Sequence, residues 1–349
     1  MADEMSADDV LSVISSVVIC SQVDVDGEDD NETSSLSSSN EEDSSDEESE
    51  TRTLYAILMV NETRGETPQI EKLTDYVKRV VPGYSRITFK EHFRVFPETF
   101  QMILRLLRPA LNATNAHGRK QLSSEKQLMV TLWFMATPDS YRSECVKFGV
   151  GKATALRAVR RVTYALHCLA PRFIKWPRGE EAICVIEEFQ RAKGFPGVIG
   201  AVDGSFIQIR APKEDAAFYI CRKKYPAIQL QAVCDARSLF IHCYAGHVGS
   251  VHVARVFRNS PLTEFIQRPD EYFPSNSHLL GDAAYTIHSH VMVPVRDNGH
   301  LTARQKNFNY CLSSTRMAIE RAFGLLKVRF RILLDCLPLT DIGVCPSSR

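Results

Sequence analysis

The chain has 349 residues, with 42 Lys and Arg against 42 Asp and Glu. This neutral sum hides an asymmetry, because residues 1–50 carry seventeen of the acidic residues and none of the basic ones. Residues 51–349 therefore hold 42 basic and 25 acidic residues, a surplus of +17. An acidic tail on a strongly basic body predicts a polyanionic partner for the body. A solvated acidic leader without any partner is the alternative interpretation of the tail.

Composition also excludes several classes of protein. Ten cysteines occur without any C-x-x-C pair, which argues against a zinc ribbon and against a thioredoxin-like site. The apolar stretch 10–19 is too short to span a bilayer, and it follows Asp8 and Asp9 where a signal peptide would be basic. We therefore expect an intracellular protein, nuclear or cytosolic, with no membrane segment.

The first region after the tail is predicted to be helical. Residues 1–52 are rich in Ser, Asp and Glu, have little to bury, and are expected to form a disordered acidic tail. From about residue 68 to 170, apolar residues recur at spacings of three and four, which predicts helices over 96–111, 124–137 and 152–169. A helical domain over 68–170 follows from this pattern.

Within this region, residues 140–168 read as helix, glycine-bearing turn and helix. The second helix has an apolar stripe that includes Leu156, Val159 and Val162. Its basic residues lie largely off that stripe; they are Lys152, Arg157, Arg160 and Arg161. The pattern is typical of a helix-turn-helix that presents a basic face to DNA. An ordinary bundle helix with solvated arginines is the alternative.

The remainder, 180–340, alternates between strand and helix patterns. After a helix at about 180–193, strands are predicted over 198–203 and 206–209, and a hairpin over 228–234 and 239–244. A helix over 251–258, a short strand over 279–281 and a strong helix over 315–330 follow. This order predicts an α/β domain with a mixed sheet flanked by helices.

Three acidic residues each end an apolar run of this region. Asp203 and Asp282 each follow a buried-type strand, and Glu320 lies on the last helix. If the two strands are neighbours, both carboxylates emerge at one edge of the sheet. We expect Gly324, one turn after Glu320, to let the helix approach that edge. Taken singly, Asp203 could form a turn before the next glycine, Asp282 could cap a helix or turn, and Glu320 could pair with Arg316.

Together the three acids predict a divalent-metal site. Hard carboxylate oxygens suit Mg²⁺ or Mn²⁺, and such ions can drive in-line displacement at phosphorus. Lys327, Arg329 and Arg331 follow Glu320 and are expected to hold a phosphate backbone near the metal. Asp203, Asp282 and Glu320 are therefore the candidate catalytic residues and metal ligands, with DNA as the expected partner.

Three motifs resemble those of the Harbinger-type transposase-derived nucleases. They are Ala-Val-Asp-Gly-Ser (201–205), Leu-Leu-Gly-Asp-Ala-Ala-Tyr (279–285) and Ile-Glu-Arg-Ala-Phe-Gly-Leu-Leu-Lys-Val-Arg-Phe (319–330). The resemblance spans roughly residues 70–340. It implies an RNase H-like nuclease domain over 180–340 with an Asp-Asp-Glu metal triad at Asp203, Asp282 and Glu320. It also implies a nuclear location and a Myb/SANT-like protein partner, while composition leaves the cytoplasm open as a second location. A homo-oligomer is also left open.

Two departures from the family pattern leave a second hypothesis open. The family usually has an Asp after the His of its Gly-Ser-x-His motif, where this chain has Val253 after His252, and Asp235 is a candidate substitute. The family domain also continues with a further helix past 342, so the end of this chain is expected to be shortened. The main hypothesis is a metal-dependent endonuclease; the alternative is a domesticated, catalytically weak DNA-binding or chromatin-associated protein. A phosphatase for small substrates is disfavoured by the basic body.

Overall fold

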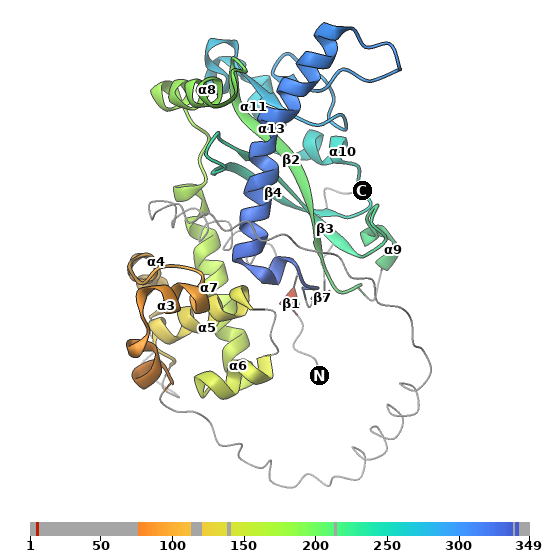
Figure 1. Ribbon diagram of the computed structural model, residues 1–349. Coiled ribbons are helices and arrows are strands. Elements are labelled where there is room, and N and C mark those ends of the chain that lie inside the picture. The colour runs from red at the N-terminus through yellow and green to blue at the C-terminus, as the bar shows by residue number, and fades with distance from the viewer. Residues whose placement is uncertain are drawn as a thin grey trace.

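The computed structural model describes residues 5–6, 76–112, 121–137, 141–212, 215–337 and 339–341. Apart from residues 5–6, the expected disordered tail over 1–52 lies outside the described residues, as does the end of the chain from 342. Figure 1 shows a layer of helices at one end of a mixed sheet, with the long helix α13 running across the sheet.

The helical layer is built around one buried helix. Its elements are η1 (Tyr76–Val80), η2 (Val81–Gly83), α3 (Arg86–Phe93), α4 (Pro97–Leu111), α5 (Ser124–Ala136), α6 (Tyr141–Phe148) and α7 (Lys152–Phe173). Helix α5 is buried from Gln127 to Ala136 and packs against α3, α4, α6 and α7. It starts where the Ser123 hydroxyl accepts a hydrogen bond from the Lys126 N–H, which satisfies an otherwise unpaired helix donor. The helices predicted at 96–111 and 124–137 are confirmed.

Helices α6 and α7 flank the predicted glycine-bearing turn. Gly149 has φ +58°, a left-handed conformation that glycine adopts without a steric penalty, and it ends α6. Helix α7 buries Leu156, Val159 and Val162, as predicted, and continues to Phe173, beyond the predicted end at 169. The two helices and their turn are therefore present, while their use in DNA binding stays a prediction.

The second layer is a five-stranded mixed sheet. Its strands are β2 (Val198–Gln208), β3 (Ala227–Cys234), β4 (Phe240–Val248), β5 (His278–Leu280) and β6 (Val291–Met292), in the order β4-β3-β2-β5-β6. Strands β2, β3 and β4 are antiparallel, and β5 and β6 run parallel to β2, as in an RNase H-like fold. The hairpin predicted over 228–244 is confirmed. A separate parallel pair joins β1 (Met5–Ser6) to β7 (Leu339–Asp341).

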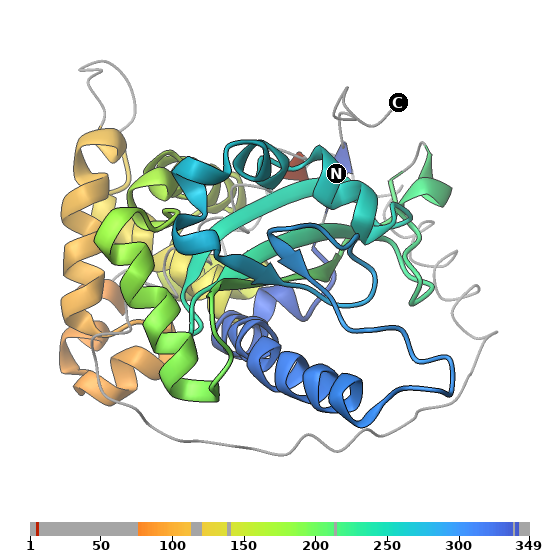
Figure 2. The same ribbon diagram turned by 90° about the horizontal axis from the view of Figure 1, so that it is seen from above.

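Helices cover both faces of this sheet. They are α8 (Gly179–Lys193), α9 (Ala216–Tyr219), α10 (Val253–Asn259), α11 (Leu262–Gln267), α12 (Pro269–Tyr272), η3 (Pro274–Asn276), α13 (Ala303–Arg329) and η4 (Arg331–Leu333). Figure 2 shows α13 on one side of the sheet and the short helices that follow β4 on the other. Helix α13 begins at Ala303 rather than at the predicted 315, because Thr302 and Gln305 form a capping box.

Strand β2 contributes apolar side chains to both faces. Val198 and Ala201 belong to a core cluster with Ile319 of α13, which extends into the helical layer. Ile199 and Val202 belong to a second cluster, with Phe257 of α10. Burial on both faces explains the continuous apolar run that precedes Asp203, since each such side chain gains roughly 1.5–3 kcal/mol on leaving water.

Gly324 does not mediate the contact between α13 and the sheet, which corrects the sequence-based expectation. A Cβ at this position would meet nothing within 4 Å, because the residue faces outward. The inward face of the helix instead carries the small residues Ala318 and Ala322, both buried. These alanines permit the close packing that was expected from the glycine.

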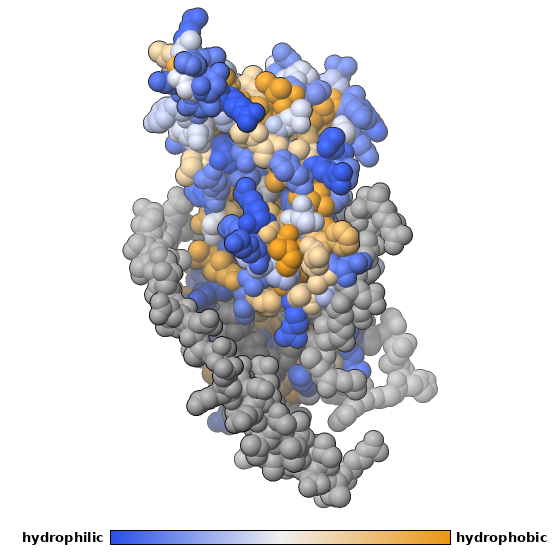
Figure 3. Space-filling view, turned by 90° about the vertical axis from the view of Figure 1, so that its right-hand side faces the viewer, coloured by the Kyte–Doolittle hydropathy of each residue, from blue (hydrophilic) through white to orange (hydrophobic). Residues whose placement is uncertain are grey.

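The visible surface mixes polar and apolar residues. Figure 3 shows hydrophilic and hydrophobic patches interspersed over the face that includes α9 and α10. Among the described residues, no helix combines the length and the apolar character needed to cross a membrane.

Candidate active site

Asp203 lies within β2 and not at its end, because the strand continues to Gln208. The sequence suggested an end because Gly204 and Ser205 break the apolar run, yet these residues pair with Gln231 and Leu230 of β3. The Asp203 side chain lies on the α13 face of the sheet, where 22 % of it is exposed. Its Oδ1 accepts a hydrogen bond of 2.7 Å from the Gly204 N–H.

Asp282 is brought beside Asp203 by the register of two parallel strands. Ala201 of β2 pairs with Leu280 of β5, so each acid stands two residues beyond a matched pair. Neighbouring strands lie about 4.8 Å apart, which makes the two aspartates adjacent across the sheet. The expectation that the two strands are neighbours is confirmed. Asp282 Oδ1 also accepts a hydrogen bond of 2.9 Å from the Ala284 N–H and so fixes the turn after β5.

Glu320 reaches the same place from α13, and Arg316 links it to the sheet. Arg316 Nη1 donates to Asp203 Oδ2 at 2.9 Å, and Arg316 Nη2 donates to Glu320 Oε1 at 2.5 Å. The Arg316 side chain is 15 % exposed and that of Glu320 is 41 % exposed. The pairing of Glu320 with Arg316 that the sequence suggested is therefore present, but the same guanidinium also binds Asp203.

The three carboxylates interact electrostatically. Burial is the main cause that raises the pKa of Asp203 above its usual value, and the charges of Asp282 and Glu320 raise it further. The Gly204 N–H and the Arg316 guanidinium act in the opposite direction. The three acids therefore repel one another, and the Arg316 cation partly offsets that repulsion.

Tyr285 and Gln231 form a buried polar layer behind the aspartates that the sequence did not single out as functional. The Gln231 side-chain amide donates to the Tyr285 hydroxyl at 3.5 Å. Burial raises the pKa of the Tyr285 hydroxyl well above its usual range, and the charges of Asp203 and Asp282 add to this effect. The sequence did contain one indication that Tyr285 lies close to the acids, because it follows Asp282 by only three residues.

The metal expectation can be tested against this geometry. Within the described residues, no group of three or more His, Cys, Asp or Glu side chains is arranged to hold a metal ion. At the three acids, the Arg316 guanidinium stands between Asp203 and Glu320. The donor set still fits Mg²⁺ or Mn²⁺, which prefer carboxylate oxygens, provided that a divalent ion takes the place of the guanidinium.

Neither Val253, which occupies the family's acidic position, nor the candidate substitute Asp235 stands beside the three acids. Val253, at the start of α10, lies on the opposite face of the sheet, where its methyl groups are 3.9 and 4.0 Å from the position of a Cβ on Gly204. Asp235 lies in the β3–β4 turn, three residues beyond Ala232, the partner of Asp203, which is about 10 Å along the strand. Its carboxylate accepts from the Leu239 N–H and pairs with a neighbouring arginine, so it does not substitute for the missing ligand.

A basic cluster, which we call the basic corner, lies three residues further along β2. The basic corner consists of Arg222, Lys223 and Lys327. Lys327 Nζ donates to the Phe206 carbonyl at 3.2 Å, and the Arg222 guanidinium lies 5.9 Å from the centre of the Phe206 ring. Burial lowers the pKa of Lys327, and the like charge of Lys223 lowers it further. Lys327 was predicted from the sequence; Arg222 and Lys223 were missed, since only the fold brings their loop to α13.

The other predicted DNA-binding residues lie apart from the acids. Arg329 is half-buried at the end of α13, and Arg331 is exposed in η4. Those of α7 belong to the helical layer: Lys152 and Arg157 are exposed, Arg160 is half-buried, and Arg161 is exposed. The Arg161 guanidinium donates to the Leu111 carbonyl at 3.3 Å and so joins α7 to the end of α4.

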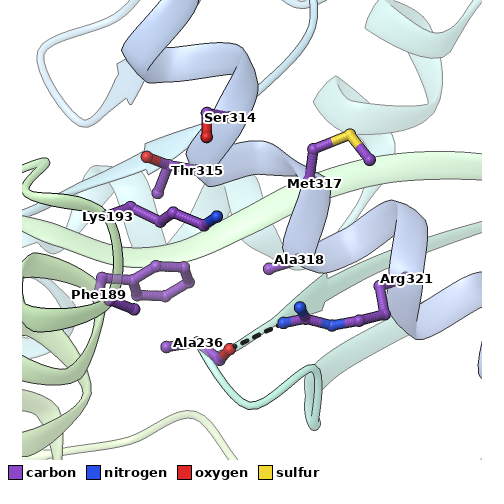
Figure 4. A pocket seen from close by; sticks show the side chains of 9 residues that line it. Phe189, Lys193, Ala236, Ser314, Thr315, Met317, Ala318 and Arg321 are labelled. Atoms are coloured by element: carbon purple, nitrogen blue, oxygen red, sulfur yellow. Dashed lines mark hydrogen bonds between the residues drawn. The ribbon is translucent and has the colours of Figure 1, made fainter. Parts of the chain in front are cut away.

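A small cavity of about 110 Å³ lies between α8, the β3–β4 turn and α13 (Figure 4). It is lined by Phe189, Ala192, Lys193, Ala236, Ser314, Thr315, Met317, Ala318 and Arg321. Arg321 closes one side by donating to the Ala236 carbonyl at 3.3 Å and to the Ser238 hydroxyl at 2.9 Å. None of the three acids lines the cavity, and its volume is well below the roughly 300 Å³ of a typical small-molecule site.

The chain is similar in sequence to known proteins. A family described as DDE superfamily endonuclease matches residues 202–346, which begin one residue before Asp203. A Rattus norvegicus protein named "Putative nuclease HARBI1" is 30 % identical over 242 residues, covering 68 % of this chain and 67 % of the relative. The Homo sapiens protein of the same name is 29 % identical over 241 residues, with the same coverage.

A plant protein is similar over a longer stretch. The Arabidopsis thaliana protein named "Antagonist of like heterochromatin protein 1" is 28 % identical over 284 residues, covering 76 % of this chain and 71 % of the relative. No solved structure matches the chain.

Proposed function

The chain belongs to the family of Harbinger transposase-derived nucleases, and we propose that it is a DNA endonuclease that uses a divalent metal at Asp203, Asp282 and Glu320. The observation that carries this proposal is that the fold brings together Asp203 of β2, Asp282 just after β5 and Glu320 of α13, with the largely buried Arg316 guanidinium bridging Asp203 and Glu320. The family description also supports it, since DDE denotes two aspartates and a glutamate, and the three acids follow in that order.

The three acids are held by different elements of the fold. Asp203 comes from a central strand, and Asp282 begins the turn after the neighbouring strand, which its own side chain fixes. Glu320 comes from a long helix packed on the sheet, so all three are held close to regular structure. A divalent cation bound there would polarise the phosphodiester and activate the attacking water. Water adds to phosphorus while one P–O ester bond breaks, and the proton released from the water passes to the departing oxygen through solvent.

The basic corner would hold the DNA strand next to the acids. Phe206 follows Asp203 by three residues, about 10 Å along an extended strand, which corresponds to roughly three nucleotides at 3.4 Å each. The hydrogen-bond partner of Lys327 Nζ is a backbone carbonyl, so the ammonium can neutralise a phosphate without first breaking an ion pair. Lys152 and Arg157 of α7 are proposed to contact duplex DNA further away. A nuclear location and a Myb/SANT-like protein partner complete the proposal, following the family resemblance.

A nicking assay on supercoiled plasmid tests the proposal. The purified protein should nick DNA with Mg²⁺ or Mn²⁺ and stop when the metal is chelated. Asp282→Asn keeps the acceptor for the Ala284 N–H, and Glu320→Gln keeps an acceptor for Arg316, so both should fold. Each should lower the rate by about 10³-fold or more, because a bound metal contributes several kcal/mol to such reactions.

Glu264→Gln is the matched control, since Glu264 is an exposed acid of α11 on the other face of the sheet. It should nick at the parent rate. If Asp282→Asn nicks as fast as the parent protein, the proposed site is wrong. Salt-sensitive DNA binding without metal-dependent nicking by the parent protein would favour the catalytically weak, chromatin-associated alternative.

A further inference from the structure

The position of Arg316 is the least expected feature of the site. It stands one turn before Glu320 on α13, and its guanidinium bridges two carboxylates that are 117 residues apart in the chain. The bridge uses two different nitrogens, one for each acid, so a single planar group connects the helix to the sheet. Only 15 % of the Arg316 side chain is exposed, so its ion pairs are largely shielded from solvent.

Arg316 engages one oxygen on each of two carboxylates that a metal would use. Oδ2 of Asp203 accepts from Arg316, while Oδ1 of the same carboxylate is already bound to the Gly204 N–H. On Glu320, Oε1 accepts from the other nitrogen. Mg²⁺ requires carboxylate oxygens at 2.0–2.1 Å in near-ideal octahedral geometry, and a guanidinium hydrogen-bonded to the same lone pairs blocks that approach. Arg316 and a divalent ion therefore compete for one space.

We propose that Arg316 is a resident counter-cation that holds Asp203 and Glu320 together in the metal-free protein and is displaced when a divalent metal binds. The inference rests on the proposed function, because it concerns the same three acids. Metal binding then becomes an exchange of one cation for another, and the ion pairs lost by Arg316 weaken the net affinity for the metal. The acids stay gathered without metal, since the guanidinium offsets their mutual repulsion.

Two substitutions separate this role from a general effect of charge. Arg316→Gln removes the bridging cation, while Arg304→Gln removes one positive charge from an exposed position in the first turn of the same helix. Mn²⁺ binding, followed by calorimetry without DNA, should be about five- to tenfold tighter in Arg316→Gln than in the parent protein, as expected for a partly exposed charged pair. Arg304→Gln should bind within about twofold of the parent, because exposed distant charges are screened by salt.

Thermal unfolding gives a second readout that does not depend on activity. In chelator, Arg316→Gln should unfold at a lower temperature than Arg304→Gln, and Mn²⁺ should raise its midpoint by more than it raises that of the parent protein. Arg316→Lys keeps one charge but cannot bridge both acids with a planar fork, so its affinity for Mn²⁺ should be intermediate. This variant also keeps the test available if Arg316→Gln does not fold.

The outcomes distinguish this inference from the proposed function. If the parent protein binds Mn²⁺, and Asp282→Asn abolishes that binding, but Arg316→Gln binds no more tightly than Arg304→Gln, the counter-cation role is wrong and the metal site stands. If Mn²⁺ binding by the parent protein is unaffected by Asp282→Asn, the metal does not bind at these acids, and both proposals fail.

Discussion

Substituting Gly200 by Ala tests whether close strand packing positions the two aspartates. Gly200 lies in β2, between β3 and β5, three residues before Asp203. A Cβ there would stand 2.6 Å from Val233 Cγ1, 3.2 Å from Leu279 Cδ2 and 3.3 Å from the Cys234 carbonyl oxygen. Carbon atoms pack best at about 3.5–4.0 Å, so the contact with Val233 is too short by about 1 Å.

The structure also sets the size of the effect. Val233 is fully buried and β-branched, so it cannot rotate out of the way. Overpacking a core typically costs about 1–3 kcal/mol, and three simultaneous close contacts favour the upper end, about 3 kcal/mol. At about 2–4 °C per kcal/mol for a protein of this size, the midpoint of thermal unfolding should fall by about 6–12 °C.

Urea unfolding of Gly200→Ala and Gly204→Ala, followed by circular dichroism, measures this difference. Gly204 lies on the same strand, but a Cβ there would be 3.9 Å from Val253, an ordinary contact, so Gly204→Ala should stay within about 0.5–1 kcal/mol of the parent protein. Gly200→Ala should also weaken Mn²⁺ binding, because a shift of β2 relative to β5 moves Asp203 away from Asp282. If Gly200→Ala is as stable as Gly204→Ala, the close packing that aligns Asp203 with Asp282 is refuted.

Four further predictions follow from single residues. Arg321→Ala should lower the free energy of unfolding by about 1–2 kcal/mol, because its hydrogen bonds fasten the β3–β4 turn to α13; urea unfolding measures this. Lys327→Gln should weaken DNA binding and reduce the slope of log K against log salt by about 0.9, whereas Lys306→Gln at the other end of α13 should not. Burial lowers the pKa of His242 to about 4. Below pH 6.5, the unfolded chain therefore binds a proton at this histidine that the folded chain does not bind until about pH 4. Stability should therefore fall by up to roughly 3 kcal/mol between pH 6.5 and 4, and His242→Phe should remove this loss in acid-unfolding curves. Gly324→Ala should raise stability by about 0.5–1 kcal/mol, because an exposed helix position favours alanine; an unchanged or lower thermal midpoint would contradict the outward orientation of this residue.

Much of the fold was predictable because local patterns carry it. Helices α4 to α7, the β3–β4 hairpin and the last helix follow from apolar spacing and turn residues, whereas α3 was not predicted. The start of α13 was also available from the sequence, since Thr302 and Gln305 have the spacing of a capping box. The full length of β2 could not be predicted from the sequence. Gly204 and Ser205 adopt an extended conformation because they pair with β3, which is more than twenty residues away in the chain.

The site was predictable in its members but not in its arrangement. Each acid ends an apolar run, which identified Asp203, Asp282 and Glu320 as candidates. That Asp203 and Asp282 are aligned depends on the β2–β5 register, which no local pattern encodes. Gly324 misled the prediction because the sequence does not show which face of the helix packs against the sheet. This glycine lies on the outward face. Arg316 could be paired with Glu320 from their spacing of four residues, but its bond to Asp203 is a product of the tertiary fold.

The central claim is that Asp203, Asp282 and Glu320 together hold the divalent cation. Anomalous diffraction from crystals grown with Mn²⁺ tests it most directly, because the signal locates manganese without any assumption about activity. We predict an anomalous peak bound by carboxylate oxygens of all three acids, and its loss in Asp282→Asn. A peak elsewhere in the protein, with Asp203 and Glu320 still joined through Arg316, would contradict the claim.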